Sequence, residues 1–339
     1  MQKTVKNLAM IAALFLLLLA RPAAAEEKAD YVSDKPELKE LKFGWKPLLK
    51  ASGTFALTHS RNVVGAQDGL NINLGLMLNS GLDYLSEKGH MWSSTLDWQL
   101  SYQYTSTLDR FTKSVDQFAF QTAYLYHIPK APYLGPFVSF TLKTSIFKGY
   151  EVRTTDLAIR KLDADGNLVR TTFVEAKDNI DLTTFFAPTT LRESVGFFGD
   201  IVNEVPVKIQ ARTGVGVWEI FVRDGYRLGD DAATPELELI RMEDSVQFGW
   251  EGNLAVSGVL RKIVNYGLKV NLMYPFVHNV DTKLEGMELM NIEIEYALGL
   301  KFTKWASLDY AFKAYHVPFI FDGWQVQNGL FISLTAAIL

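Results

Sequence analysis

The chain has 339 residues, a formal net charge of −4 and no cysteine, and 48% of its residues are apolar. This length is enough for one large or two ordinary domains. The absence of cysteine excludes disulfide scaffolds, cysteine-ligated zinc, iron–sulfur clusters and cysteine nucleophiles. A slightly acidic balance without clustered Lys and Arg gives no indication of nucleic-acid binding.

The first 25 residues have the layout of a cleavable export signal. Lys3 and Lys6 precede an uncharged apolar run at 8–20, and three alanines at 23–25 come directly before two glutamates. Because a permanent membrane helix needs about 20 apolar residues, we expect residues 1–25 to be a signal peptide, removed after export through the Sec pathway. Residues 26–44 are charged and turn-like, and we expect them to form a periplasmic lead-in to one domain at 45–339.

From Trp45 onward, apolar and polar residues alternate. In segment 70–84 most even positions carry Leu, Ile or Tyr and most odd positions carry Asn, Gly or Asp, and 264–276 and 292–303 repeat the pattern. A soluble β-sandwich also alternates, but its strands are commonly about 5–6 residues long, whereas a membrane-spanning strand needs about 9–11. Tyr and Trp gather where the apolar faces begin and end, as at a membrane–water interface. The pattern therefore favours a membrane barrel.

Taken in chain order, the alternating segments predict twelve strands. They lie near 46–59, 70–86, 91–105, 115–128, 134–148, 188–200, 205–221, 243–260, 264–277, 290–303, 306–317 and 326–338. The count is even, and short connections alternate with long ones, as in barrels with short periplasmic turns and long extracellular loops. The predicted fold is all-β: a transmembrane antiparallel up-and-down β-barrel of the outer-membrane type. The last residue, Leu339, is not the usual terminal aromatic.

The longest predicted loop, near 149–187, contains a hairpin of its own. Segments 157–162 and 168–173 alternate around the turn 163–166, which ends in Asp-Gly, a strong hairpin signal. We expect this extracellular loop to fold either over the mouth of the barrel or into its lumen. The run 163–167 is similar to the start of an EF-hand, but Val174 stands where a Glu is needed, so we interpret it as a turn.

If the apolar face meets lipid, the polar face of each strand lines the lumen. Odd-numbered residues of most strands then face inward, with the parity reversed in 205–221. The predicted lumen residues are the acids Asp83, Asp97, Glu251, Glu293, Glu295 and Asp309, and the bases Lys143, Arg192, Lys208, Arg212, Lys269, Lys301 and Lys313. The turn at 304–305 places Glu295 opposite Lys313, and Lys301 near Ser307 and Asp309. These charges form either an ion-pair network that fills a narrow barrel or charged rings that select a solute.

Little in the sequence indicates catalysis or a cofactor. The five histidines, His59, His90, His127, His278 and His316, are spread along the chain, and we interpret them as interfacial or turn residues without a metal. Acidic residues 230, 231, 236 and 238 form a patch that is either a solvated loop or a site for calcium or lipopolysaccharide bridged by divalent ions. An outer-membrane lipase needs Ser and His together, and His59 and Ser60 are sequence neighbours that point to opposite faces of a strand.

Short motifs resemble one known family. His90-Met91-Trp92-Ser93-Ser94-Thr95-Leu96-Asp97, the stretch Phe185-Phe186-Ala187-Pro188 with Leu191 and Gly196, and a late pattern from Trp250 through Tyr274 to Leu300 carry the likeness. The resemblance is to an outer-membrane group known as domain of unknown function 3078, and it extends over about Trp45 to Tyr315. It implies an outer-membrane barrel and implies no activity, so it assigns no functional residues.

These observations predict a barrel in the bacterial outer membrane, surrounded by lipid and lipopolysaccharide and inserted by the outer-membrane assembly machinery. We expect a passive channel for small polar solutes. The first alternative is a closed structural or adhesin-like barrel that acts through its loops, and an enzyme comes third. No cofactor and no nucleic-acid partner is expected.

Overall fold

The computed structural model describes residues 43–60, 69–204, 206–229, 236–261, 263–280, 282–303, 305–319 and 321–337. The signal peptide predicted at 1–25 lies outside the described residues, as does the lead-in up to residue 42, so both stay predictions. Within these ranges, no helix is long and apolar enough to cross a lipid bilayer.

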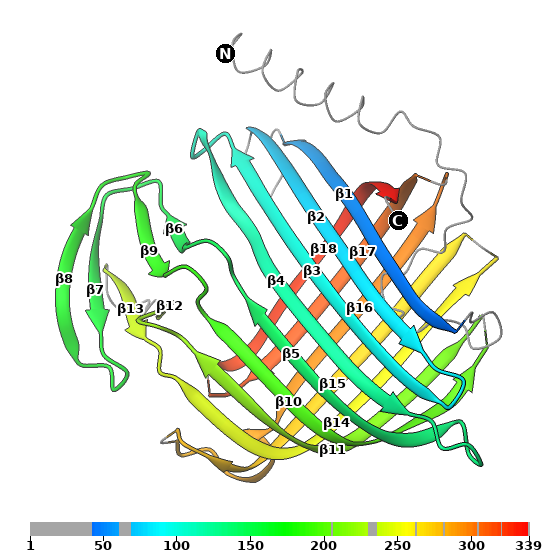
Figure 1. Cartoon of the computed structure of the whole chain (residues 1–339). Helices are drawn as coiled ribbons and strands as arrows, with labels where there is room; N and C mark the ends of the chain where they lie inside the picture. Colours follow the sequence, from blue (N-terminus) through cyan, green and yellow to red (C-terminus); the bar gives the residue numbers. More distant parts are fainter. Residues whose placement is uncertain are drawn as a thin grey trace.

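Twelve antiparallel strands close into one barrel (Figure 1). They are β1 (Gly44–Ser60), β2 (Gly69–Leu85), β3 (His90–Thr105), β4 (Arg110–Tyr126), β5 (Leu134–Thr144), β10 (Thr189–Asn203), β11 (Lys208–Phe221), β14 (Ser245–Leu260), β15 (Val264–His278), β16 (Asn291–Lys301), β17 (Ala306–Val317) and β18 (Phe321–Ala337). The predicted number of strands is confirmed. β4 and β18 begin at Arg110 and Phe321, earlier than the predicted 115 and 326.

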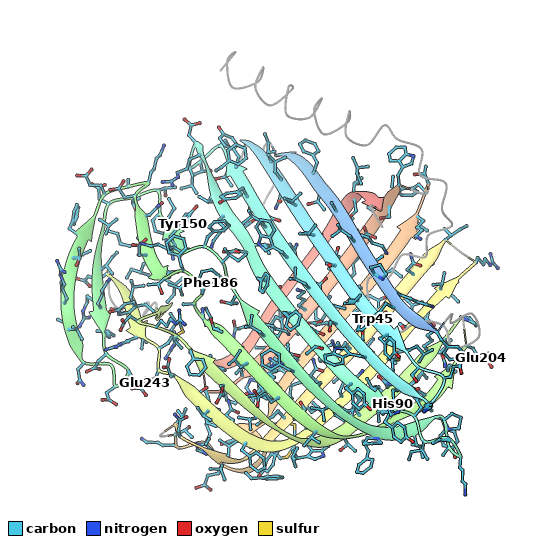
Figure 2. The ribbon with its side chains drawn as sticks, viewed as in Figure 1. Trp45, His90, Tyr150, Phe186, Glu204 and Glu243 are labelled. Atoms are coloured by element: carbon cyan, nitrogen blue, oxygen red, sulfur yellow. The ribbon has the colours of Figure 1, made fainter. Side chains whose placement is uncertain are left out.

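The outer surface carries an apolar belt between two groups of aromatic rings. Leu76, Val138, Val195, Val215 and Leu298 are exposed along the strands. At the end with the short turns, which we name the turn end, the rings of Trp45 (labelled in Figure 2) and Tyr84 lie 4.9 Å apart. At the other end, the loop end, the ring of Phe276 packs against those of Phe248 and Tyr274. A closed antiparallel barrel with such a belt and aromatic girdles is the architecture of outer-membrane proteins.

Two further strands, β1 and β10, depart from the odd-inward pattern. In β1, Ser52 is buried whereas Trp45 and Phe55 are exposed, so its even-numbered residues face inward. Val195 and Phe197 of β10 are exposed whereas Phe198 is buried, so the even-numbered residues of β10 face inward, as they do in β11. The reason is that the long connection before β10 does not carry the parity of β5 forward. Each strand instead turns its more apolar face toward lipid.

The two longest connections pair with each other outside the barrel. β7 (Leu157–Leu162) and β8 (Leu168–Val174) form the predicted hairpin, and β7 pairs in parallel with β13 (Leu237–Arg241), which pairs with β12 (Tyr226–Leu228). This four-stranded loop sheet stands beside the loop end at the left of Figure 1. β6 (Gly149–Val152) and β9 (Asn179–Thr183) pair between the loop sheet and the barrel in Figure 1, and a short 3-10 helix (Gly286–Leu289) precedes β16.

The loop sheet has its own hydrophobic core. Ile159, Ile180, Leu237 and Leu239 are buried together there. The predicted 149–187 loop therefore neither enters the lumen nor remains a lone hairpin. The burial of these side chains against the 222–242 connection holds it outside.

The described part of the predicted acidic patch lies in or next to the loop sheet. Glu238 is buried and pairs with Arg160 at 3.3 Å, so it is not part of a solvated loop; residues 230 and 231 lie outside the described residues. At the far tip of the hairpin, Asp163 accepts hydrogen bonds from the side chain and backbone of Asn167, which lower the pKa of the Asp163 carboxyl. Gly166 has a φ of 87°, which glycine adopts without strain, and the predicted turn is present.

The barrel closes between its first and last strands. Six residue pairs join β1 to β18 in the part of the chain that the structure describes, from Lys50 with Ala337 to Phe55 with Ile332. Twelve pairs join β18 to β17. The closing seam is thus the shorter of the two contacts that β18 makes.

Candidate functional site

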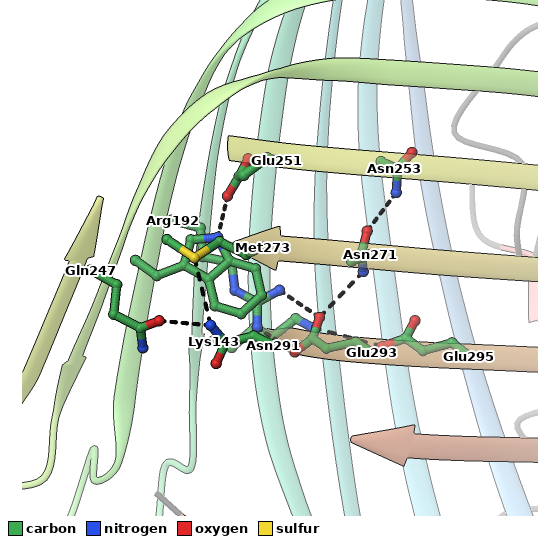
Figure 3. Close-up of polar contacts among 11 residues, drawn as sticks. Lys143, Arg192, Gln247, Glu251, Asn253, Asn271, Met273, Asn291, Glu293 and Glu295 are labelled. Atoms are coloured by element: carbon green, nitrogen blue, oxygen red, sulfur yellow. Dashed lines mark hydrogen bonds and ion pairs between the residues drawn. The ribbon is translucent and has the colours of Figure 1, made fainter. Parts of the chain in front are cut away.

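A charged cluster crosses the lumen (Figure 3). Arg192 of β10 donates two hydrogen bonds to the carboxylate of Glu293 on β16, one of them 2.5 Å long. Three strands lie between β10 and β16 in the barrel order, so this pair spans the interior. Lys143 of β5 extends from the same side, with its Nζ 3.7 Å from both Glu293 and Glu295.

Glu293 is held on its own side by a ladder of amides. Asn253, Asn271 and Glu293 are direct cross-strand neighbours on β14, β15 and β16. Asn253 donates to the Asn271 oxygen at 2.5 Å, and Asn271 donates to Glu293 at 3.2 Å. With these partners, Glu293 can be 3% exposed and still have its charge satisfied.

Arg192 is held on its own side of the barrel by Trp218. The two residues are paired in register on β10 and β11, and the guanidinium carbon lies 3.6 Å from the centre of the indole ring. The indole N–H and the Ser194 hydroxyl both donate to Glu251. A guanidinium stacked on an aromatic ring and bonded to a carboxylate is fixed in orientation.

Two cavities meet at this cluster. The inner chamber, toward the turn end, has a volume of about 160 Å³, and the outer chamber, toward the loop end, about 400 Å³. Lys143, Arg192 and Trp218 line both chambers. The chambers are therefore separated by side chains, and we call Lys143, Arg192, Trp218 and Glu293 the constriction.

The two chambers differ in charge. The basic residues of the inner chamber are Lys143, Arg192, Lys208, Arg212 and Lys269, and its one acidic lining residue is Glu251. The outer chamber is lined by Asp116 and Glu293 along with Lys143 and Arg192. The inner chamber is thus the basic one.

The remaining predicted lumen residues are not part of the constriction, although Glu295 contacts its Lys143. Lys313 donates to Gln117 across the barrel at 3.0 Å, Asp97 accepts from Asn79 at 2.7 Å and Asp309 from Ser307 at 2.8 Å. Asp83 lies beside Ser93, and Lys301 beside Ser307, near the short turns. Glu295 is opposite Lys313, as predicted.

Several residues of the site were not predicted from sequence. Trp218 and Asn271 carry no charge, so a list of lumen charges does not contain them, although alternation places both on the inward face of their strands. Asp200, also unpredicted, accepts a hydrogen bond from Gln210 and lies 3.5 Å from His127. In the described ranges, no group of three or more His, Asp or Glu side chains is arranged to hold a metal ion.

The resemblance noted in the sequence is confirmed over part of the chain. A family described as "Protein of unknown function (DUF3078)" matches residues 64–150, a range that contains the His90–Asp97 motif. The motifs at 185–196 and beyond Trp250 lie outside it. No curated protein sequence matches this chain.

Solved outer-membrane barrels are similar in outline. An outer membrane channel from Pseudomonas putida F1 is 9% identical, with a TM-score of 0.40, over 93% of this chain and all (100%) of that one. The translocator domain of the autotransporter NalP from Neisseria meningitidis is 9% identical, with a TM-score of 0.37, over 97% of each chain. The NanC porin is 7% identical, with a TM-score of 0.33, over 86% of this chain and 100% of that one. Likeness at this level says nothing of what this chain transports or binds.

Proposed function

We propose that this protein is an outer-membrane channel for small polar solutes, exported through the Sec pathway, with the loop end facing outward. The observation that carries the proposal is the pair of cavities on the barrel interior, which meet at a constriction made only of side chains. Because the constriction consists of side chains and not of backbone, removing those side chains widens the passage without a change in the barrel wall.

Single-channel recording in a planar bilayer tests this proposal. Wild-type protein is expected to give discrete conductance steps. The double variant Arg192→Ala, Glu293→Ala removes the pair that crosses the lumen and should raise the conductance. Glu193→Gln is the matched control, because Glu193 is the next residue of β10 and is exposed on the outer face. It should leave the conductance unchanged.

Ion selectivity gives an independent test of the inner chamber. Charged rings in a pore select ions by sign, so neutralising Lys208 and Arg212 together should shift selectivity toward cations. A folded barrel that never conducts, or a selectivity that does not move in the double variant, would contradict the proposal.

The loop sheet favours a second candidate, an adhesin-like barrel that acts through its loops. β8 is an edge strand of that sheet, and Val169 and Phe173 are exposed on it. Exposed apolar edge strands pair readily with other chains. For this function, replacing 157–174 by a short Gly-Ser linker should abolish cell clumping, while filling the lumen should have no effect.

The lipase interpretation remains the third proposal. The side chains of His59 and Ser60 lie outside the described part of the chain, so their arrangement is left to experiment. Phospholipid hydrolysis that is lost on substitution of either residue would support an enzyme over a channel.

A further inference from the structure

The lining of the inner chamber carries more basic than acidic side chains. It holds five basic residues and one acid. Glu293 and Glu295, which lie against Arg192 and Lys143, raise the acids to three against five. Asp200 accepts a hydrogen bond from the lining residue Gln210 and makes four. The bases still exceed the acids, and the basic residues that are not part of the constriction are Lys208, Arg212 and Lys269.

The floor of the same chamber is apolar. Met91, Leu125 and Phe137 line it, and they belong to a buried cluster with Leu85 and Phe198 at the turn end of the barrel. Inward-facing apolar side chains are unusual for a water-filled lumen, whose wall is normally polar. They provide a surface for the apolar part of a ligand.

Arg212 belongs to the basic part of the lining and also lies beside the apolar floor. It lies opposite Phe198 in the pairing of β10 with β11, and its guanidinium carbon is 5.6 Å from the centre of the Phe137 ring. Its Nε donates to Gln210 at 3.0 Å, which fixes the plane of the guanidinium. A carboxylate at Arg212 would therefore have its attached carbon skeleton beside Phe137.

We propose that the inner chamber binds a small organic anion, a carboxylate attached to an aromatic ring or a short apolar chain. The volume of about 160 Å³ suits this class, because an apolar cavity of about 150 Å³ holds one benzene molecule. Arg212 binds the carboxylate, and Met91, Leu125 and Phe137 contact the apolar part. The inference rests on the proposed function in one respect: it names the solute class of that channel.

Isothermal titration calorimetry on the full chain in detergent, with heats from empty micelles subtracted, tests the inference. The probes are benzoate, benzyl alcohol as its uncharged analogue, and acetate as an anion without the ring. Benzoate should bind about tenfold more tightly than either, since both the charge and the ring contribute to binding. Equal binding of benzoate and benzyl alcohol, or of benzoate and acetate, would overturn the proposal.

Variants assign the two contacts to residues. Arg212→Gln should weaken benzoate binding about tenfold and leave benzyl alcohol unchanged. Phe137→Leu should reduce the preference for benzoate over acetate. Lys313→Gln is the matched control, since Lys313 lines neither chamber and its loss should not change binding. The mobility difference between unheated and boiled samples on a gel verifies that each variant is folded.

The calorimetry tests the binding proposal and the conductance measurements test the channel proposal, so either proposal can be contradicted without the other. A barrel that conducts but shows no preference for benzoate contradicts this inference and leaves the channel proposal standing. A barrel that binds benzoate through Arg212 but gives no conductance steps contradicts the channel and supports a binding chamber.

Discussion

Removing the negative charge of Glu293 is the sharpest perturbation of the constriction. The carboxylate accepts two hydrogen bonds from Arg192 and one from Asn271, and it lies 3.7 Å from the Lys143 ammonium. In Glu293→Gln one oxygen acceptor becomes an N–H donor that faces the Arg192 guanidinium. A hydrogen bond to a charged group contributes about 1.5–3 kcal/mol, and breaking a buried ion pair costs about 3–5 kcal/mol. Because one oxygen remains, we expect a loss of about 3 kcal/mol in the free energy of unfolding.

Urea unfolding of the barrel in detergent, followed by tryptophan fluorescence, measures this loss, and Trp218 lies within the perturbed cluster. With a slope of about 3 kcal/mol/M, the midpoint should fall by about 1 M. Glu295→Gln is the matched control on the same strand. Its carboxylate is 30% exposed and lies 3.7 Å from Lys143, so its loss should cost less than about 1 kcal/mol.

The double variant with Arg192→Gln separates the ion pair from a general effect on packing. Residues in direct contact show coupling energies of about 0.5–3 kcal/mol, so the double variant should lose less stability than the sum of the two single variants. Equal losses for Glu293→Gln and Glu295→Gln, together with additive single variants, would refute the view that Glu293 organises the constriction.

Three further predictions concern other contacts. Leu239→Ala should destabilise the loop sheet by about 2–5 kcal/mol. The loops should then be cleaved faster by a protease, while the gel mobility of the barrel stays unchanged. Equal cleavage rates in the variant and the wild type would contradict this prediction. Trp218→Phe removes the donor to Glu251 and weakens the stacking on Arg192, and should cost about 1–2 kcal/mol in the urea assay. Hydrogen bonds from Asn167 lower the pKa of Asp163. The ionised carboxylate therefore stabilises the hairpin tip at pH values above the ordinary Asp pKa of about 3.9. This contribution is lost as the pH falls through the folded-state pKa. Amide exchange at Asn167 should then rise in acid relative to the Asp163→Asn variant, and identical profiles would exclude the effect.

The barrel strands were predictable because their signal is local. In β2 and β16 the side chains alternate between lipid and lumen along most of the strand, so the period of two appears directly in the sequence. Across a tight turn the register also follows from the sequence, which is why Glu295 was correctly placed opposite Lys313.

Contacts between distant strands were not predictable in this way. Arg192 and Glu293 meet because the sheet curves until β10 faces β16, and neither alternation nor a turn encodes that distance. The loop sheet has the same origin. β13 pairs with β7 although β8 to β12 lie between them in the chain. The residues Leu237–Arg241 of β13 are too few to be distinguished from a loop by periodicity.

The short seam between β1 and β18 determines how the barrel should respond to mechanical force. Among the described residues, a pull on the carboxyl end loads six residue pairs on one side of β18 and twelve on the other, so the contact with β1 separates first. The cylinder then becomes a curved sheet with two free edges. From that point the strands peel away in hairpin order from the carboxyl end, and the loop sheet, which is anchored on the strands near the middle of the chain, detaches only after β14 has been removed.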